Sequence, residues 1–292
     1  MSIPINAHKI FMANDIRCNL KTVSKRLSSL KVSEFVTRKL FDPSVHLLNR
    51  KSKLLRPALV LMGASAIGEN PSDFIDLAVA AELMHTSSLI HDDIVDGDKV
   101  RRGVQSVHVK YGTAVALLAG DALISKAVSL SAQYGKYVLM SMTKASMDMC
   151  AGEVLDYKYQ DTGSAPDLDE YLRVSFLKSA SLIGACWSAA AVYKRSKRAE
   201  DFYESGTDIG IAFQIRDDIL DFIIAEEKHS NRGLIPNIVT SLEKEYRIGK
   251  YSALIKAIKL NNQYVKKAEE RISGTRAYKM LNDYAELVKV HL

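Results

Sequence analysis

Two clusters of three aspartates are the residues of this sequence best suited to chemistry. They share the spacing D-D-x-x-D and consist of Asp92, Asp93 and Asp96, and of Asp217, Asp218 and Asp221. Residues four apart lie on one face of a helix, so the first and last aspartate of each cluster project together. Like charges this close repel, and Mg²⁺, which takes oxygen ligands, would remove the repulsion. The clusters therefore indicate divalent metal binding, with simple solvation of an acidic helix face as the alternative.

The second cluster lies in an apolar stretch, FQIRDDILDF, between Phe213 and Phe222. Uncompensated carboxylates would be costly in such surroundings, which strengthens the expectation of a cation there. Gln214 precedes the first aspartate of this cluster by three residues and could contact the same ligand.

Basic residues lie on both sides of the first cluster. Arg101 and Arg102 follow it, and Lys53 and Arg56 precede it in KSKLLRP. Guanidinium and ammonium groups bind phosphate oxygens well, so these residues are candidates for a diphosphate site. Each of them could also be a solvated surface residue.

Two further polar residues occupy positions that call for a partner. His85 lies seven residues before Asp92, two helical turns along roughly the same face, and is either a ligand contact or a core histidine. Lys178 lies within the apolar stretch VSFLKSASLIGA. A lysine that cannot easily reach solvent there needs an anionic partner.

Helical patterns dominate the elements that must position these residues. Helices are expected over about 71–96, 168–193 and 201–224, the second of them capped by Asp167. Breaks between the remaining helices are expected at Asp42-Pro43, Gly68, Gly249 and Gly274. No alternating strand pattern or linker is evident. We therefore predict an all-α protein with a single domain over 1–292.

Composition restricts the class of protein. Of the 292 residues 47% are hydrophobic and 25% charged, which excludes wholesale disorder, and 40 basic against 34 acidic residues give a net charge of +6. This mild charge suits a polyanionic small ligand or a membrane surface as well as nucleic acid. Three cysteines without metal-ligand spacing indicate neither a disulfide framework nor a zinc site. Since we see no signal-peptide core and no apolar run of about 18 residues, we expect a cytoplasmic protein.

Taken together, the motifs resemble the trans-isoprenyl diphosphate synthases, the relatives of farnesyl and geranylgeranyl diphosphate synthase. In chain order they are K-x-x-R-P at 53–57, ELMHTSSLIHDDIVDGDKVRRG at 82–103, GDALISKA at 120–127, GEVLD at 152–156, LKSASL at 177–182 and GIAFQIRDDILDF at 210–222. The resemblance implies an all-α bundle of long antiparallel helices around a deep central cavity, usually in a homodimer. It implies small-molecule substrates, no nucleic acid and at most peripheral contact with membranes.

The resemblance also implies a role for each candidate. The residues expected to hold Mg²⁺, with three ions per active site when substrate is bound, are Asp92, Asp93, Asp96, Asp217 and Asp218, with Asp221 less direct. Those expected at the diphosphate of an allylic substrate (dimethylallyl, geranyl or farnesyl diphosphate) are Arg101, Lys178 and Gln214. Those expected at the diphosphate of isopentenyl diphosphate are Lys53, Arg56, His85 and Arg102.

The residue inventory agrees with the chemistry of this family. Ionising an allylic C–O bond creates a carbocation and a diphosphate leaving group, whose charge metal ions and cationic side chains stabilise. The isopentenyl double bond then attacks, and loss of a proton to the released diphosphate restores an alkene. A terpene cyclase, which shares one such motif, needs no isopentenyl site and usually has a different second motif. A non-catalytic subunit or a helical scaffold for divalent ions remain alternatives.

Product length in this family depends on the residues just before the first aspartate motif, where bulky side chains close the cavity. Here these positions are Ser87 and Ser88, and the next turn brings Met84. One helical turn is about 5.4 Å, roughly one prenyl unit. We therefore expect a product of C20 or longer, with a C15 farnesyl product as the alternative.

The sequence departs from the family pattern at three places, of which the exchange of a usual Pro-Thr pair for Gln105 and Ser106 is expected to have no consequence. Leu54 stands where a second cation is common. The Gly-Lys loop that usually follows the second motif is absent or shortened between Asp221 and Pro236, where Lys228 and Arg232 are possible substitutes. A shortened loop would weaken closure over the diphosphate, and it is the feature that supports the non-catalytic alternative.

Overall fold

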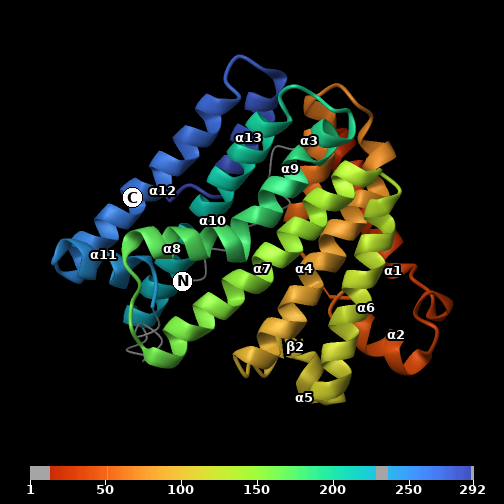
Figure 1. Cartoon of the computed structure of the whole chain (residues 1–292), viewed down its shortest axis with the longest axis horizontal. Coiled ribbons are helices and arrows are strands. Elements are labelled where there is room, and N and C mark those ends of the chain that lie inside the picture. Colours follow the sequence, from red (N-terminus) through yellow and green to blue (C-terminus); the bar gives the residue numbers. More distant parts are fainter. Residues whose placement is uncertain (1–13, 51, 228–235, 291–292) are drawn as a thin grey trace. The chain divides into compact units, whose positions relative to one another are not determined.

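The computed structural model describes residues 14–50, 52–227 and 236–290, which form helices almost throughout (Figure 1). The contacts of these residues divide into two compact units. We call them the α4 unit (residues 14–144 and 186–196) and the α10 unit (residues 145–185 and 197–290). The predicted all-α class is confirmed, whereas a single domain around a central cavity stays a prediction.

The α4 unit carries the first aspartate cluster. Its α-helices are α1 (Asn14–Ser28), α2 (Arg38–Val45), α3 (Leu55–Ala66), α4 (Ile75–Val95), α5 (Val107–Tyr111), α6 (Thr113–Ala132) and the beginning of α7 (Lys136–Thr162). Two short 3₁₀ turns, η2 (Val32–Phe35) and η3 (Pro71–Phe74), precede α2 and α4. Within this unit α4 packs most extensively on α6. Small residues permit close packing here, since a Cβ atom on Gly120 of α6 would lie 2.2 Å from Nε2 of His91.

The α10 unit carries the second cluster. Its helices are the remainder of α7, α8 (Leu168–Ser175), the π-turn η4 (Phe176–Ala180), α9 (Ser181–Tyr193), α10 (Ala199–Glu227), α11 (Ile238–Tyr246), α12 (Lys250–Arg271) and α13 (Arg276–Ala285). Residues 186–193 of α9 belong to the α4 unit. The core contains Ile215 and Ile219 of α10 and Val239 of α11, packed with residues of α8 and α12.

Most of the expected helix boundaries are confirmed. Asp167 caps α8 by accepting a hydrogen bond from the Glu170 amide (2.9 Å). Gly68 and Gly274 adopt positive φ angles, 85° and 70°, in breaks where glycine is favoured. The break expected at Asp42-Pro43 is wrong, because Pro43 lies inside α2.

Two further expectations need correction. The helix expected over 168–193 is interrupted by η4, which places Lys178 on a π-turn. A two-stranded hairpin, β1 (Val100–Arg101) with β2 (Val104–Gln105), follows α4 where no strand was expected. Its turn residues Arg102 and Gly103 both have positive φ, 51° and 77°, as the tightest hairpin turns require.

We expected no stretch long and apolar enough to span a membrane, and this expectation is wrong. Two helical stretches, Thr113–Ala132 and Leu168–Tyr193, are long and apolar enough. The most apolar window of the second is 78% buried inside the structure, as in a core helix, whereas that of the first is only 33% buried.

Candidate active site

The hairpin after α4 directs its two arginines to different carboxylates. Arg101 donates from Nε to Oδ1 of Asp93 (2.6 Å) and from Nη2 to Oδ2 of Asp98 (2.9 Å). Arg102 donates from Nη2 to Oε1 of Glu82 (3.1 Å). Because Arg101 ends β1 while Arg102 lies in the turn with positive φ, one dipeptide serves two separate places in the α4 unit.

Asp93 is fully buried, unlike the other two members of its cluster. Burial raises the pKa of Asp93, and the Arg101 guanidinium partly offsets this. Its second oxygen, Oδ2, is buried and has no hydrogen-bond partner. Asp92 is half-buried, and Asp96 is exposed at the end of α4. The three carboxylates therefore differ sharply in environment despite their regular spacing.

A basic group forms around His85 in the same unit. Burial, with further contributions from Arg56, Arg102 and Arg101, lowers the pKa of His85 well below its usual value, so the imidazole is neutral. Arg56 has a buried Nε without a hydrogen-bond partner. The structure thus brings together three of the four residues expected at isopentenyl diphosphate. Lys53, the fourth, is exposed on the segment before α3.

Glu82 balances part of this positive charge and was missed by the sequence analysis. It is 1% exposed, and its Oε1 accepts hydrogen bonds from Arg102 (3.1 Å) and from Oγ of Ser52 (2.7 Å). Its place one helical turn before His85 is the only sequence signal that could have indicated this role.

The residues expected to set product length lie on α4 near this group. Ser87 is fully buried and donates to the Gly120 carbonyl of α6 (2.9 Å), and Met84 is also buried. Ser88 is only half-buried and donates to the His85 carbonyl (2.9 Å). Ser87 is therefore committed to packing between α4 and α6, whereas Ser88 retains some exposure.

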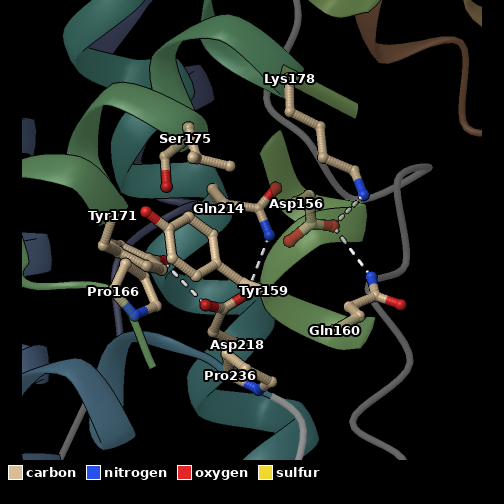
Figure 2. Close-up of a pocket in the computed structure, with 11 residues that line it drawn as sticks. Asp156, Tyr159, Gln160, Pro166, Tyr171, Ser175, Lys178, Gln214, Asp218 and Pro236 are labelled. Atoms are coloured by element: carbon tan, nitrogen blue, oxygen red, sulfur yellow. Dashed lines mark hydrogen bonds and ion pairs between the residues drawn. The ribbon is translucent and has the colours of Figure 1, made fainter. Parts of the chain in front are cut away.

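The α10 unit contains a pocket of about 140 Å³ (Figure 2). Its polar lining includes two residues expected to contact the diphosphate and one expected to bind a metal ion. These three residues are Lys178, Gln214 and Asp218. The pocket also contains polar residues that the sequence analysis did not single out: Asp156, Tyr159, Gln160, Tyr171 and Ser175.

Lys178 has the anionic partners that its apolar sequence context predicted. Its ammonium group pairs with Asp156 and with Glu153 (3.0 Å), both from the GEVLD motif on α7. Burial alone would lower the pKa of Lys178, but these two carboxylates outweigh it and raise the pKa above its usual value. Gly152 permits the close approach, because a Cβ atom there would lie 2.4 Å from the Lys178 amide nitrogen.

Asp218 lies at the centre of a hydrogen-bond network in the same pocket. It accepts hydrogen bonds from Tyr171 Oη (2.8 Å), Gln214 Nε2 (2.8 Å) and the Ile238 amide (3.1 Å). Burial raises the pKa of Asp218 to about 6, although these three donors oppose the shift. Asp217 pairs instead with Arg216 (3.2 Å), and Asp221 is exposed.

The donor set fits Mg²⁺ only together with a substrate. Among the residues that the structure describes, no three His, Cys, Asp or Glu side chains gather closely enough to hold an ion by themselves. Mg²⁺ commonly binds through one or two carboxylates plus substrate phosphates, and each cluster offers such oxygens. The orphaned Oδ2 of Asp93 is a further indication of a missing partner. The suggested lid substitutes Lys228 and Arg232 lie outside the described residues.

Comparison with known proteins assigns the family. The family model named polyprenyl synthetase matches residues 37–239, well over half of the chain. The chain belongs to the polyprenyl synthetase family. This match includes both aspartate clusters, the arginine hairpin and Lys178.

Relatives of this polyprenyl synthetase family member support the assignment. The short chain isoprenyl diphosphate synthase of Methanothermobacter thermautotrophicus is 37% identical over 203 residues, 67% of this chain and 62% of the relative. The geranylfarnesyl diphosphate synthase of Methanosarcina mazei is 35% identical over 237 residues, which is 79% of this chain and 78% of the relative. The chain thus matches less than two thirds of the length of the first relative.

The fold has close counterparts among solved structures. The geranylgeranyl pyrophosphate synthetase of Pyrococcus horikoshii superposes with a TM-score of 0.84 at 25% identity. The match covers 95% of this chain and 97% of that structure. The all-α class therefore agrees with that of a solved relative.

Proposed function

We propose that this protein condenses isopentenyl diphosphate head-to-tail with an allylic diphosphate, giving a trans-prenyl diphosphate of C20 or longer and releasing diphosphate. One observation carries the proposal: Lys178, Gln214 and Asp218 line one pocket. A cation, an amide and a carboxylate together can receive a diphosphate with its metal ions. Family membership and the names of the relatives, geranylfarnesyl and geranylgeranyl diphosphate synthases among them, support the same reaction and product range.

The α10 pocket would stabilise the leaving group. When the allylic C–O bond breaks, negative charge develops on the diphosphate, and the Lys178 ammonium and the Gln214 amide can donate to it. Two carboxylates, from Glu153 and Asp156, pair with this single ammonium, and a third, from Asp218, lines the same pocket. A bare diphosphate would be repelled by this excess of acid, which is a physical reason for dependence on divalent cations.

The α4 unit would bind the second substrate. Arg56 and Arg102 supply charge for the diphosphate of isopentenyl diphosphate, and neutral His85 can donate a hydrogen bond. Arg101 would assist at the allylic diphosphate, while its contact with Asp93 holds the guanidinium in place. Lys53, exposed on the segment before α3, would be recruited on binding.

Mg²⁺, with three ions per site as the expected number, would supply Lewis-acid stabilisation of the departing diphosphate. Asp92, Asp96 and Asp217 would hold the ions, with Asp221 less direct. Asp93 and Asp218 would also contribute oxygens to the ions, and the protein donors that already engage them would fix their orientation.

The remaining steps require no side-chain nucleophile. The isopentenyl double bond attacks the allylic cation, a C–C bond forms, and the resulting cation loses a proton to the released diphosphate. The chain must exclude water during this sequence, since water would quench the cation. The apolar residues of α4, such as Met84, would provide part of this wall.

We further propose a cytoplasmic homodimer formed through α6. This helix leaves Leu117 and Leu118 exposed by 45% and 59%, and only 33% of its most apolar window is buried in one chain. Covering such a face with a second copy would remove it from water. Sedimentation analysis of the wild type and of Leu118→Glu tests this, with a dimer expected for the first and a monomer for the second.

Incubation with labelled isopentenyl diphosphate, Mg²⁺ and each allylic primer in turn tests the reaction, with products resolved by chain length. A product of C20 or longer is expected. A C15 product would support the prenyl transfer activity but refute the proposed product length. Absence of product with every primer would refute the proposed activity and favour a non-catalytic subunit of a heteromeric synthase.

A further inference from the structure

The hydroxyl group of Tyr171 connects α8 to the carboxylate at the centre of the α10 pocket (Figure 2). The side chain is 94% buried by area, since Tyr171 is 6% exposed, and its Oη donates to Oδ2 of Asp218 (2.8 Å). The same oxygen accepts the Ile238 amide at the beginning of α11 (3.1 Å). Asp218 thereby joins α8, α10 and α11 at one point.

The network continues from Asp218 to the diphosphate contact. Oδ1 of Asp218 accepts from Nε2 of Gln214 (2.8 Å), and Oε1 of Gln214 accepts from Oγ of Ser179 (2.7 Å). With its oxygen and one amide hydrogen engaged, the Gln214 amide has a single orientation, which leaves its other hydrogen available. Ser179 follows Lys178 on the π-turn, so the network ends on the element that carries the ammonium group, and Gln214 and Lys178 line the same pocket.

Tyr171 has no evident chemical role of its own. Its pKa lies well above the usual value because of burial and the adjacent Asp218, so the phenol remains a hydrogen-bond donor. A phenol has one hydrogen to donate, and here it goes to Asp218. Without it the carboxylate would lose one of three donors and a constraint on its orientation.

We propose that Tyr171 is a positioning residue of the prenyl transfer site, acting through Asp218 to fix the Gln214 amide beside Lys178. The inference rests on the proposed function for its substrate, an allylic diphosphate with divalent cations. It concerns the hydroxyl group alone. The ring is part of the hydrophobic core of the unit, together with Ile215 and Ile238, and would keep that place in a phenylalanine variant.

The test compares Tyr171→Phe with Tyr264→Phe in the full chain. Tyr264 packs against the same hydrophobic core from α12 and does not line the pocket. Calorimetry would measure binding of inorganic diphosphate in the presence of Mg²⁺, and kinetics would measure KM for each substrate. We expect Tyr171→Phe to bind diphosphate about tenfold more weakly. KM for the allylic substrate should rise by a similar factor while KM for isopentenyl diphosphate stays the same, and Tyr264→Phe should match the wild type.

Binding and KM values equal to those of the wild type would overturn the inference, as would an equal rise in both KM values. Thermal unfolding of both variants separates a loss of fold from a loss of positioning. Because the calorimetric result needs no turnover, an inactive wild type that still binds diphosphate would refute the proposed reaction without affecting this test. Asp218→Asn, which keeps the side-chain shape, should weaken diphosphate binding at least as much as Tyr171→Phe does.

Discussion

The two aspartate clusters have the same spacing, yet the two units neutralise them in different ways. In the α4 unit the buried second aspartate, Asp93, is paired with the guanidinium of Arg101. In the α10 unit the corresponding Asp218 receives only neutral donors, among them Tyr171 and Gln214. A full positive charge favours the ionised carboxylate more strongly than neutral donors do. Burial raises the pKa of both carboxylates, and it raises that of Asp218 to about 6 even though three neutral donors oppose the shift.

The two units also differ in the balance of positive and negative side chains: the α4 unit is the more basic and the α10 unit the more acidic. Near His85 the α4 unit gathers three arginines, and Glu82 is the buried carboxylate paired with Arg102. In the α10 unit two carboxylates pair with the one ammonium of Lys178, and Asp218 adds a third carboxylate to the same pocket. The first site can attract a diphosphate by itself, whereas the second needs divalent cations to do so. Equal sequence motifs therefore imply unequal tasks.

The largest expected effect comes from removing the first aspartate of either cluster. Asp92→Ala and Asp217→Ala should each lower kcat by a factor of about 100 to 1,000, because oxygens that hold the cations on the leaving group are lost. Steady-state kinetics at saturating Mg²⁺ measures this. Asp42→Ala, which removes an exposed carboxylate from α2, is the control. Near-normal turnover of either cluster variant would show that its motif holds no essential ion.

A second pair of variants removes one negative charge from each unit, so that the effects of the two charge balances can be compared. Glu82→Gln should raise KM for isopentenyl diphosphate about tenfold, because Arg102 loses the carboxylate that orients it. Asp156→Asn should lower the Mg²⁺ concentration needed for half-maximal activity several-fold, because the pocket loses surplus negative charge while Glu153 still holds Lys178. Mg²⁺ titrations and KM values measure both effects.

Glu69→Gln provides the control for this pair, since Glu69 pairs with Lys194 away from either site (2.9 Å). If Glu82→Gln and Asp156→Asn changed the Mg²⁺ requirement in the same direction and by the same amount, the contrast between the two units would be wrong.

Whether a feature of this contrast could be predicted from the sequence depends on how far apart in the chain the contacting residues lie. The spacing of the aspartates, the cap at Asp167 and the need of Lys178 for an anion are local features, and the structure confirms the last two. Asp156 and Glu82 are single carboxylates among 34 acidic residues. Their importance arises from packing with residues about 20 positions away in the chain, which no local pattern encodes.

The hairpin and the π-turn were missed for a related reason. A strand of two residues has no alternation to detect, and the turn at Arg102 uses a left-handed arginine where glycine or asparagine is the usual signal. The π-turn at 176–180 interrupts a largely apolar helical pattern, and its backbone at Lys178 lies in close approach to Gly152 of α7. In both cases tertiary packing overrides local preference.

Variants of the two serines on α4 that are expected to control product length should have a smaller effect. Ser88→Phe should shorten the product by about one prenyl unit, because a bulky side chain enters the half-buried position. Ser87→Phe should instead destabilise the fold by about 1–3 kcal/mol, because Ser87 is packed against Gly120 of α6. Chromatography of the products and thermal unfolding distinguish the two. An unchanged product from Ser88→Phe would exclude that position from the cavity wall.

The smallest expected effect is a pH dependence of folding stability that arises from His85 on the arginine-rich side. His85 faces Arg56, Arg101 and Arg102, and its pKa in the folded protein is well below the usual value near 6.5. As the pH falls from 7 to 5, the unfolded chain takes up a proton at this histidine and the folded chain does not, so folding stability decreases.

His85→Asn removes this titration, and we expect the free energy of unfolding of the wild type to fall by about 2 kcal/mol more than that of the variant over this range. Chemical unfolding followed by the fluorescence of Trp187, the single tryptophan and fully buried, measures the difference at each pH. Parallel stability curves would mean that His85 can be protonated in place, which requires an anion among the arginines. A diphosphate added at pH 5 supplies such an anion, so it should restore stability to the wild type more than to His85→Asn if this group is where isopentenyl diphosphate binds.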